Sequence, residues 1–115
     1  MDRARACMMT TEYMLRDYKV KSGEMTEWLR EWSTKIYPLR LKFGFKVTGA
    51  WIIGKERFVW ILSYDGEKGG FKKADERYYD SKLRKSLKPN PARHLSKVRH
   101  WMMESALAEY GGKSC

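Results

Sequence analysis

The sequence is poor in cysteine and contains no apolar segment long enough to cross a membrane. Its two cysteines, Cys7 and Cys115, stand at opposite ends of the chain, so they cannot build the disulfide framework of a small secreted domain. No uninterrupted apolar run approaches the roughly 18 residues of a membrane span, and the first residues lack the apolar segment of a secretory signal. These absences predict a soluble cytoplasmic protein with no membrane span.

Motifs for metal binding, nucleophilic catalysis and phosphate binding are also missing. The chain has no Cys-x-x-Cys or His-x-x-x-His pair, and it offers no convincing Ser-His-Asp or Cys-His combination. The glycine-rich segment 66–73 lacks the spacing and the Lys-Ser/Thr ending of a nucleotide-binding loop. The sequence therefore predicts no metal site and no cofactor.

Acidic residues are scarce overall and absent from one stretch. Lys and Arg number 24 against 14 Asp and Glu, and residues 81–103 contain basic side chains but no acidic one. Such a stretch can attract anions, although basic residues near a helix C-terminus also suit the helix dipole and otherwise face solvent. Both interpretations stay open for a candidate anion-binding rim, which consists of Lys82, Arg84, Lys85, Lys88 and Arg93.

The hydrophobic residues are abundant and regularly spaced. They make up 43% of the chain, sixteen of them aromatic, which argues against disorder. Apolar side chains from Met25 to Ile36 follow the helical period, with Pro38 and Gly44 set to kink and end that helix. The predicted elements, in chain order, are a strand over 12–20, a helix from residue 25, strands over 45–53 and 57–64, a helix over 71–87 and a strand over 97–106.

The element order βαββαβ with right-handed crossovers predicts an α+β fold. It is a ferredoxin-like four-stranded antiparallel sheet with both helices on one face. We expect residues 12–107 to form this domain, between a flexible N-terminal arm (1–11) and a C-terminal tail (108–115). The strand 57–64 is apolar on both faces, so the face without helices needs a cover. We therefore expect a homodimer in which two open sheet faces pack together and close a barrel.

Several segments of the chain resemble the NIPSNAP family. The segments are LRDYKVKSGEMTEWLREW (15–32), YPLRLKFGFKVTGAW (37–51), FVWILSYD (58–65) and KPNPAR (88–93). In order, they match an L-R-x-Y strand, a K-x-G turn, an acidic-aromatic helix, P-L-R, G-F-x-V-x-G-x-W and F-V-W-L-x-x-Y. The resemblance implies the dimeric α/β-barrel superfamily, although the molecular activity of the family is poorly defined.

Relatives in that superfamily include haem-degrading monooxygenases, cofactor-free quinone-forming monooxygenases and isomerases, which commonly place their pocket between sheet and helices. The haem-degrading relatives take their ligand from a helix, whereas neither predicted helix of this chain contains a histidine. His94 is expected at the surface and His100 is expected to pack on the last strand. The resemblance therefore does not extend to haem.

Aromatic and polar side chains on the first three strands are candidates for a ligand pocket. Arg16 can hold a carboxylate or an enolate, and Tyr18 or Tyr64 can donate a hydrogen bond to a developing oxyanion. The alternative is that the tryptophans fill the core or a dimer interface and that Arg16 pairs with a nearby acid. The candidate ligand-binding residues are Arg16, Tyr18, Trp51, Trp60 and Tyr64.

The predicted function is to bind a small, partly apolar or anionic organic ligand, with cofactor-free monooxygenase or isomerase chemistry as its catalytic form. A non-enzymatic structural or interaction dimer is an open alternative. Nucleic-acid binding through the basic surface is another, because RNA-recognition modules share this element order. The segment KFGFKV (42–47) faintly echoes their aromatic signature, but that signature belongs on the third strand.

Overall fold

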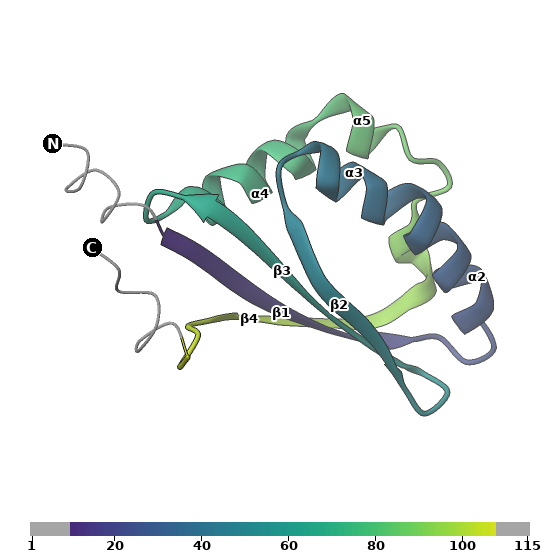
Figure 1. The fold of residues 1–115 in the computed structure, drawn as a ribbon. Coiled ribbons are helices and arrows are strands. Elements are labelled where there is room, and N and C mark those ends of the chain that lie inside the picture. The colour runs from purple at the N-terminus through teal and green to yellow at the C-terminus, as the bar shows by residue number, and fades with distance from the viewer. Residues whose placement is uncertain (1–9, 108–115) are drawn as a thin grey trace, which may run out of the picture.

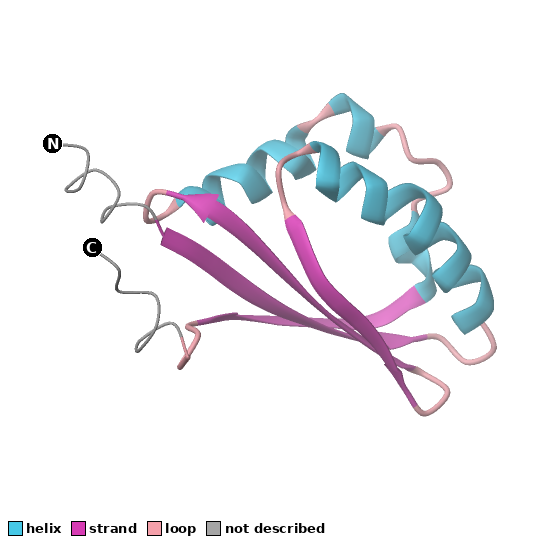
Figure 2. Ribbon diagram, in the orientation of Figure 1, coloured by secondary structure: helices cyan, strands magenta, loops and turns pink. Residues whose placement is uncertain are grey.

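The protein folds into one antiparallel sheet with helices on one side, as the computed structural model of residues 10–107 shows (Figure 1). The strands lie in the order β2-β3-β1-β4, which confirms the predicted ferredoxin-like α+β fold. Figure 2 shows the helices gathered on one face of the twisted sheet. The strands are β1 (Thr10–Val20), β2 (Lys46–Ile53), β3 (Arg57–Gly66) and β4 (Leu95–Met103).

The strand boundaries differ slightly from the predicted ones. β1 begins at Thr10, two residues inside the expected arm, while β4 runs over 95–103 rather than 97–106. The remainder of the expected arm and the tail 108–115 lie outside the described residues.

The first helical segment is continuous but contains an irregular turn. It consists of α2 (Met25–Glu31), a π-helical turn (Trp32–Ile36) and α3 (Tyr37–Lys42). The backbone N–H of Tyr37 donates to the carbonyl of Trp32, five residues back. Pro38 has no N–H with which to continue the ordinary ladder, so the wider turn lets the helix run on past the proline.

The second helix is shorter than the hydrophobic pattern predicts. α4 (Gly70–Asp80) ends at Ser81, which is extended, and a single turn, α5 (Lys82–Lys85), follows. The Ser81 hydroxyl accepts a hydrogen bond from the backbone N–H of Arg84 at 3.0 Å and so caps that turn. A 3₁₀ turn over Pro91–His94 then leads into β4.

The helices bury one face of the sheet. The strand register places Arg16 opposite Trp60 and Tyr18 opposite Phe58 on that face. Trp28 of α2 packs edge-on against the rings of Tyr18 and Phe58, with centroid distances of 5.7 and 5.6 Å. These large rings set the spacing between the helical layer and the sheet.

The opposite face of the sheet carries apolar side chains without a helical cover. Leu15 lies opposite both Ile61 and Trp101, and Trp51 lies opposite Val59. Trp51 and Trp101 are each about half exposed. No helix within residues 10–107 lies on this side (Figure 1), which we call the open face.

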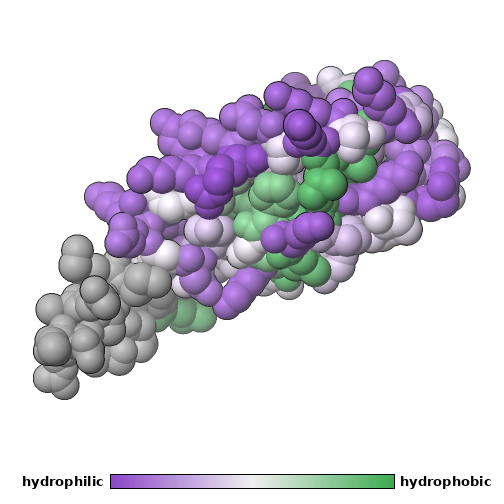
Figure 3. Space-filling model, turned by 90° about the horizontal axis from the view of Figure 1, so that it is seen from above, coloured by the Kyte–Doolittle hydropathy of each residue, from purple (hydrophilic) through white to green (hydrophobic). Residues whose placement is uncertain are grey.

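Seen from the helical side, the surface is largely hydrophilic, with a hydrophobic patch near its middle (Figure 3). None of the helices in the described part of the chain is long and apolar enough to span a membrane.

Candidate functional site

A cavity of about 220 Å³ lies between the sheet and the helical layer. Its wall is made by β1, β3, β4 and by all the helical segments, which the fold brings together from residues 16 to 98. Three arginines, three tyrosines, two tryptophans and four aliphatic side chains line it. A mostly apolar wall with a few placed polar groups is the usual make-up of a small-molecule site.

Arg16 is a buried charged group of this wall, with 7% of its surface exposed. Its Nε donates to the Tyr18 hydroxyl at 2.5 Å, and its Nη2 donates to the Tyr79 hydroxyl at 3.2 Å. Its Nη1 contacts the sulfur of Met14 at 3.4 Å, which is a weak acceptor. Arg16 therefore has no carboxylate partner among the described residues, and the expected alternative of a local ion pair does not hold.

Tyr79 connects Arg16 to a second arginine. Its hydroxyl oxygen also accepts from Nη2 of Arg40 at 3.3 Å. Arg40 is buried, and its Nη1 donates to Asp75 at 2.7 Å, so its charge is balanced. The Arg40 guanidinium also lies 3.8 Å from the ring centroid of Tyr78, a favourable cation–π distance.

Arg84 reaches the cavity from α5. Its Nη2 donates to the Asn90 side chain at 3.3 Å, while its buried Nε has no hydrogen-bond partner. The guanidinium stands 5.7 Å from the ring centroid of Tyr79. Of the five residues proposed as an anion-binding rim, Arg84 is the one that lines this cavity.

The charges of the cavity are uneven. Burial alone would lower the pKa of the Arg16 guanidinium, but its contacts with Tyr18 and Tyr79 raise that pKa overall. Burial raises the pKa of the Tyr18 hydroxyl, which stays protonated and neutral at physiological pH. The positive charge of Arg16 is therefore held by dipoles rather than by an anion.

Three of the five predicted ligand residues meet at this cavity: Arg16, Tyr18 and Trp60. Trp51 does not join them, because it lies on the open face. The register of β2 shifts between Val47 and Gly49, and this bulge places Val47 on the helical side and Trp51 on the other. The expected convergence of all five side chains is therefore wrong for Trp51.

Tyr64 also lies away from the cavity, although it is on the helical side of β3. It packs against Phe45, with ring centroids 5.3 Å apart, and its hydroxyl accepts from Arg77 at 3.2 Å. Its ring stands close to Gly44, where a Cβ atom would meet it at 3.2 Å. Tyr64 thus packs beside the turn that begins β2, outside the cavity lining.

The other members of the proposed rim point to different roles. Arg93 makes two hydrogen bonds to the carboxylate of Glu31, at 2.9 and 2.8 Å. The three lysines of the rim are exposed, on α5 and in the loop that follows it: Lys82, Lys85 and Lys88.

The environments of the two histidines are the reverse of those expected from the sequence. His94 is buried, and its ring nitrogens contact Glu24 at 2.8 Å and Glu31 at 3.3 Å. His100 is exposed on β4. Within residues 10–107, no group of three or more His, Cys, Asp or Glu side chains is arranged to hold a metal ion.

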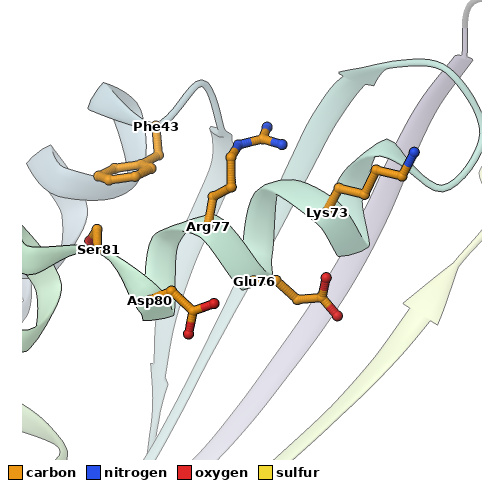
Figure 4. Close-up of a pocket in the computed structure, with 6 residues that line it drawn as sticks. All are labelled: Phe43, Lys73, Glu76, Arg77, Asp80 and Ser81. Atoms are coloured by element: carbon orange, nitrogen blue, oxygen red, sulfur yellow. The ribbon is translucent and has the colours of Figure 1, made fainter.

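A second depression, of about 610 Å³, lies on the outer side of α4 (Figure 4). Figure 4 shows that Lys73, Glu76, Arg77 and Asp80 all project from this helix, beside Phe43. Two bases and two acids compensate one another there, and all four are exposed. The enclosed cavity with its unbalanced charge is therefore the better candidate site.

The segment 42–47 does not present aromatic rings for stacking on bases. Phe45 is buried, 2% exposed, and packs against Phe71 with ring centroids 5.2 Å apart. Phe43 packs edge-on against Tyr78. These rings belong to the core, so the similarity of this segment to the RNA-recognition signature has no structural counterpart.

The sequence did not predict that Tyr79, Arg40 and Arg84 would line one cavity with Arg16. Tyr79 is 63 residues away from Arg16 along the chain, and it reads as one position of an amphipathic helix. The one available signal was the excess of basic residues over 81–103, which includes Arg84.

Comparison with known proteins identifies the fold. No protein-family model matches the sequence, and no curated protein matches it. An uncharacterised NIPSNAP domain protein from Burkholderia xenovorans superposes with a TM-score of 0.72 at 15% identity, covering 83% of this chain and 94% of that one. A NIPSNAP family protein from Agrobacterium tumefaciens gives 0.73 at 11% identity, covering 83% and 85%.

A putative antibiotic biosynthesis monooxygenase from Nitrosomonas europaea is more distant, with a TM-score of 0.64 and 9% identity over 84% of this chain and 90% of that one. At these identities the similarity concerns the fold. The Burkholderia and Agrobacterium structures carry the family name that the sequence motifs suggested, and the chain has the ferredoxin-like fold of the NIPSNAP family proteins.

Proposed function

We propose that the protein binds a small, partly apolar organic molecule in the cavity between sheet and helices. The observation that carries this proposal is the cavity itself, enclosed by rings and aliphatic side chains around a buried arginine. Its volume of about 220 Å³ is below the roughly 300–1,000 Å³ of sites for drug-sized ligands, which favours a molecule of one ring or a short chain.

Cofactor-free monooxygenase or isomerase chemistry is the catalytic form of this proposal. The Tyr18 and Tyr79 hydroxyls each accept from Arg16, so their own protons remain to be donated to a developing oxyanion. The similarity to a putative monooxygenase shows that this chain has a fold found in such a protein, and it does not identify a reaction for this chain. Oxygen consumption by the protein with a bound phenol or hydroquinone would test the oxygenase form.

Homodimer formation through the open face is a further part of the proposal. Exposed Trp51 and Trp101 on that face support it, because large apolar patches on a monomer are uncommon. A dimer of this kind without a ligand would be a structural or interaction protein, so ligand binding is the property that separates the two functions.

The test of ligand binding is a variant that fills the cavity. Val98 of β4 lines the cavity and is half exposed, so Val98→Trp should enter the cavity without a large cost in stability. Ligand-observed NMR with a panel of monocyclic aromatic compounds should show binding to the wild type and at least tenfold weaker binding to Val98→Trp. Leu83→Trp is the matched control, since Leu83 is exposed on α5 outside the cavity lining.

The results distinguish a ligand-binding protein from a purely structural dimer. Binding that survives Val98→Trp would place the ligand elsewhere and contradict the proposed site. Absence of any binding to the wild type would favour the structural dimer. The cytoplasmic location expected from the sequence stays a prediction.

A further inference from the structure

The lining of the cavity supplies hydrogen-bond donors and contains no acidic side chain. All three of its charged residues are arginines, and its three tyrosines are the remaining groups that carry oxygen in their side chains. Buried charges in proteins are normally paired, because an isolated ion is costly to remove from water. The inference below rests on the ligand site proposed above. The excess of positive charge in the lining indicates an anionic ligand.

Arg16 has hydrogen-bonding capacity that the protein leaves unused. A guanidinium carries five N–H groups, one on Nε and two on each terminal nitrogen. The Tyr18 hydroxyl oxygen accepts a hydrogen bond from Nε, the Met14 sulfur contacts Nη1, and the Tyr79 hydroxyl oxygen accepts from Nη2. Each terminal nitrogen therefore retains one N–H, and N–H groups on the two terminal nitrogens of a guanidinium are donors that a carboxylate can accept with its two oxygens.

Tyr79 strengthens this donor set. Its oxygen accepts from Arg16 and from Arg40, at 3.2 and 3.3 Å, so its own hydroxyl proton must be donated elsewhere. Tyr79 lines the cavity and is 39% exposed, which places it where a ligand in the cavity meets solvent. A carboxylate on Arg16 would have this hydroxyl as a neighbouring donor.

Arg84 supplies a second positive charge to the same cavity. Its Nε is buried without a partner, and no carboxylate contacts it among the described residues. Arg40, in contrast, has Asp75 to balance it. The cavity thus holds two arginines without acids, and exposed Lys82 and Lys85 flank Arg84 on α5. Positively charged side chains beside the entrance of a site raise the association rate of anions.

We infer that the ligand is a small aromatic or aliphatic monocarboxylate, with its carboxylate on Arg16 and its apolar part against Trp28 and Trp60. Trp28 and Trp60 are both fully buried and line the cavity, so they offer apolar contact area. The small volume favours one carboxylate over a phosphate, whose second charge is more costly to bury. So does the charge balance, because Arg40 is paired with Asp75 and, within residues 10–107, Arg16 is the one buried arginine of the lining without a carboxylate partner.

The experiment compares acids with their neutral amides. Isothermal titration calorimetry and ligand-observed NMR would use benzoate, phenylacetate and hexanoate, each beside its primary amide. The wild type should bind at least one acid ten times or more tightly than its amide. Arg16→Met, which keeps an unbranched apolar stem and removes the guanidinium charge, should abolish that preference and leave amide binding within about twofold.

Controls keep the result interpretable. Arg77→Met removes an exposed arginine from the other depression and should change nothing. Arg16→Lys retains the charge without the paired donors and should keep part of the preference. If Arg16→Met does not fold, Arg84→Met and Arg16→Lys carry the test, with an expected three- to tenfold loss of acid binding in each.

The outcomes distinguish the charge assignment from the proposed function. Equal binding of acids and amides, or an acid preference that persists in Arg16→Met, would overturn the carboxylate inference while leaving a ligand site in place. Acid binding that is lost only in Arg77→Met would overturn the choice of cavity. Absence of binding by every acid and every amide would overturn the proposed function itself.

Discussion

At the scale of single residues, the two buried carboxylates of residues 10–107, Asp17 and Glu31, are each shared by more than one basic side chain. Glu31 is 3% exposed and accepts from Arg93 through both of its oxygens, while His94 contacts it at 3.3 Å. The hydrogen bonds from Arg93 are the main cause that lowers the pKa of Glu31, from 4.5 to about 2. This cluster joins α2 to the turn that precedes β4.

The lowered pKa of Glu31 makes stability depend on acid pH. Because the folded pKa lies below the unfolded one, its contribution is complete above about pH 4.5 and is lost as pH falls toward 2. Glu31→Gln should cost about 2–3 kcal/mol at pH 7 and flatten the unfolding free energy over that range. Urea unfolding between pH 7 and pH 2.5 measures both effects.

The control for this prediction is a glutamate of the same helix. Glu27 pairs with Arg30 on the exposed side of α2, so Glu27→Gln should change stability by less than about 0.5 kcal/mol. An unchanged acid slope in Glu31→Gln would show that the Arg93 and His94 contacts do not set the pH dependence.

At the scale of elements, a strand residue caps the second helix. α4 has Gly69 at its N-cap, in the left-handed conformation, and no side chain of its own caps it. The carboxylate of Glu12 on β1 accepts instead, from the backbone N–H of Gly69 at 3.0 Å and of Phe71 at 2.9 Å. The helix that carries Tyr79 is thereby fixed to the strand that carries Arg16.

Removal of that cap should loosen α4. Glu12→Ala leaves two N–H groups without their acceptor and removes a negative charge from the positive end of the helix, which should cost about 1–2 kcal/mol. Amide hydrogen exchange should accelerate over the first turn of α4 and much less in α2. Glu67→Ala, an exposed acid just before α4, should leave exchange unchanged, and equal effects of both variants would refute the cap.

The sequence predicted elements well where periodicity is strong. The helix from residue 25 and the hairpin of β2 and β3 follow from their patterns, and the four-stranded antiparallel sheet follows from the element order. The Thr48 bulge gave no signal, because alternation alone places Val47 and Trp51 on one face. Similarly, the amphipathic pattern runs past Ser81, although the serine ends α4 and caps α5.

The candidate site was predictable only on the strand that alternates cleanly. Arg16 and Tyr18 are two residues apart on β1, and the register brings Trp60 to Arg16, so these three share a face. The arginines that complete the cavity come from α3 and α5, whose rotation about their axes depends on packing against Tyr78 and Tyr79. Contacts of that kind are set by tertiary structure and leave no local pattern.

At the scale of the whole molecule, the open face combines exposed apolar side chains with ion pairs. The open face carries the half-exposed side chains of Trp51 and Trp101, the Lys46–Asp65 ion pair and a second ionic cluster. The centre of this cluster is Asp17, 4% exposed, which accepts from Arg57 at 2.9 and 3.0 Å and from Arg99 at 3.0 Å. The hydrogen bonds from Arg57 are the main cause that lowers the pKa of Asp17.

A second copy is the partner that we expect on this face, and its loss should be measurable as mass. Light scattering after size-exclusion chromatography should give twice the 13.7 kDa chain mass at micromolar concentration. Ile61→Glu buries a charge at the centre of the proposed contact, opposite Leu15, and should halve that mass. Leu83→Glu, on the exposed side of α5, should leave the dimer intact.

Stable interfaces bury about 800 Å² on each partner and are apolar at their centre, which a sheet face with two half-exposed tryptophans can supply. The cavity lies on the other side of the sheet, so Ile61→Glu should also leave acid binding to Arg16 intact if a single copy completes the site. A wild-type mass of one chain would contradict the dimer. A monomeric Ile61→Glu that no longer binds would show instead that the cavity needs the second copy to hold its shape.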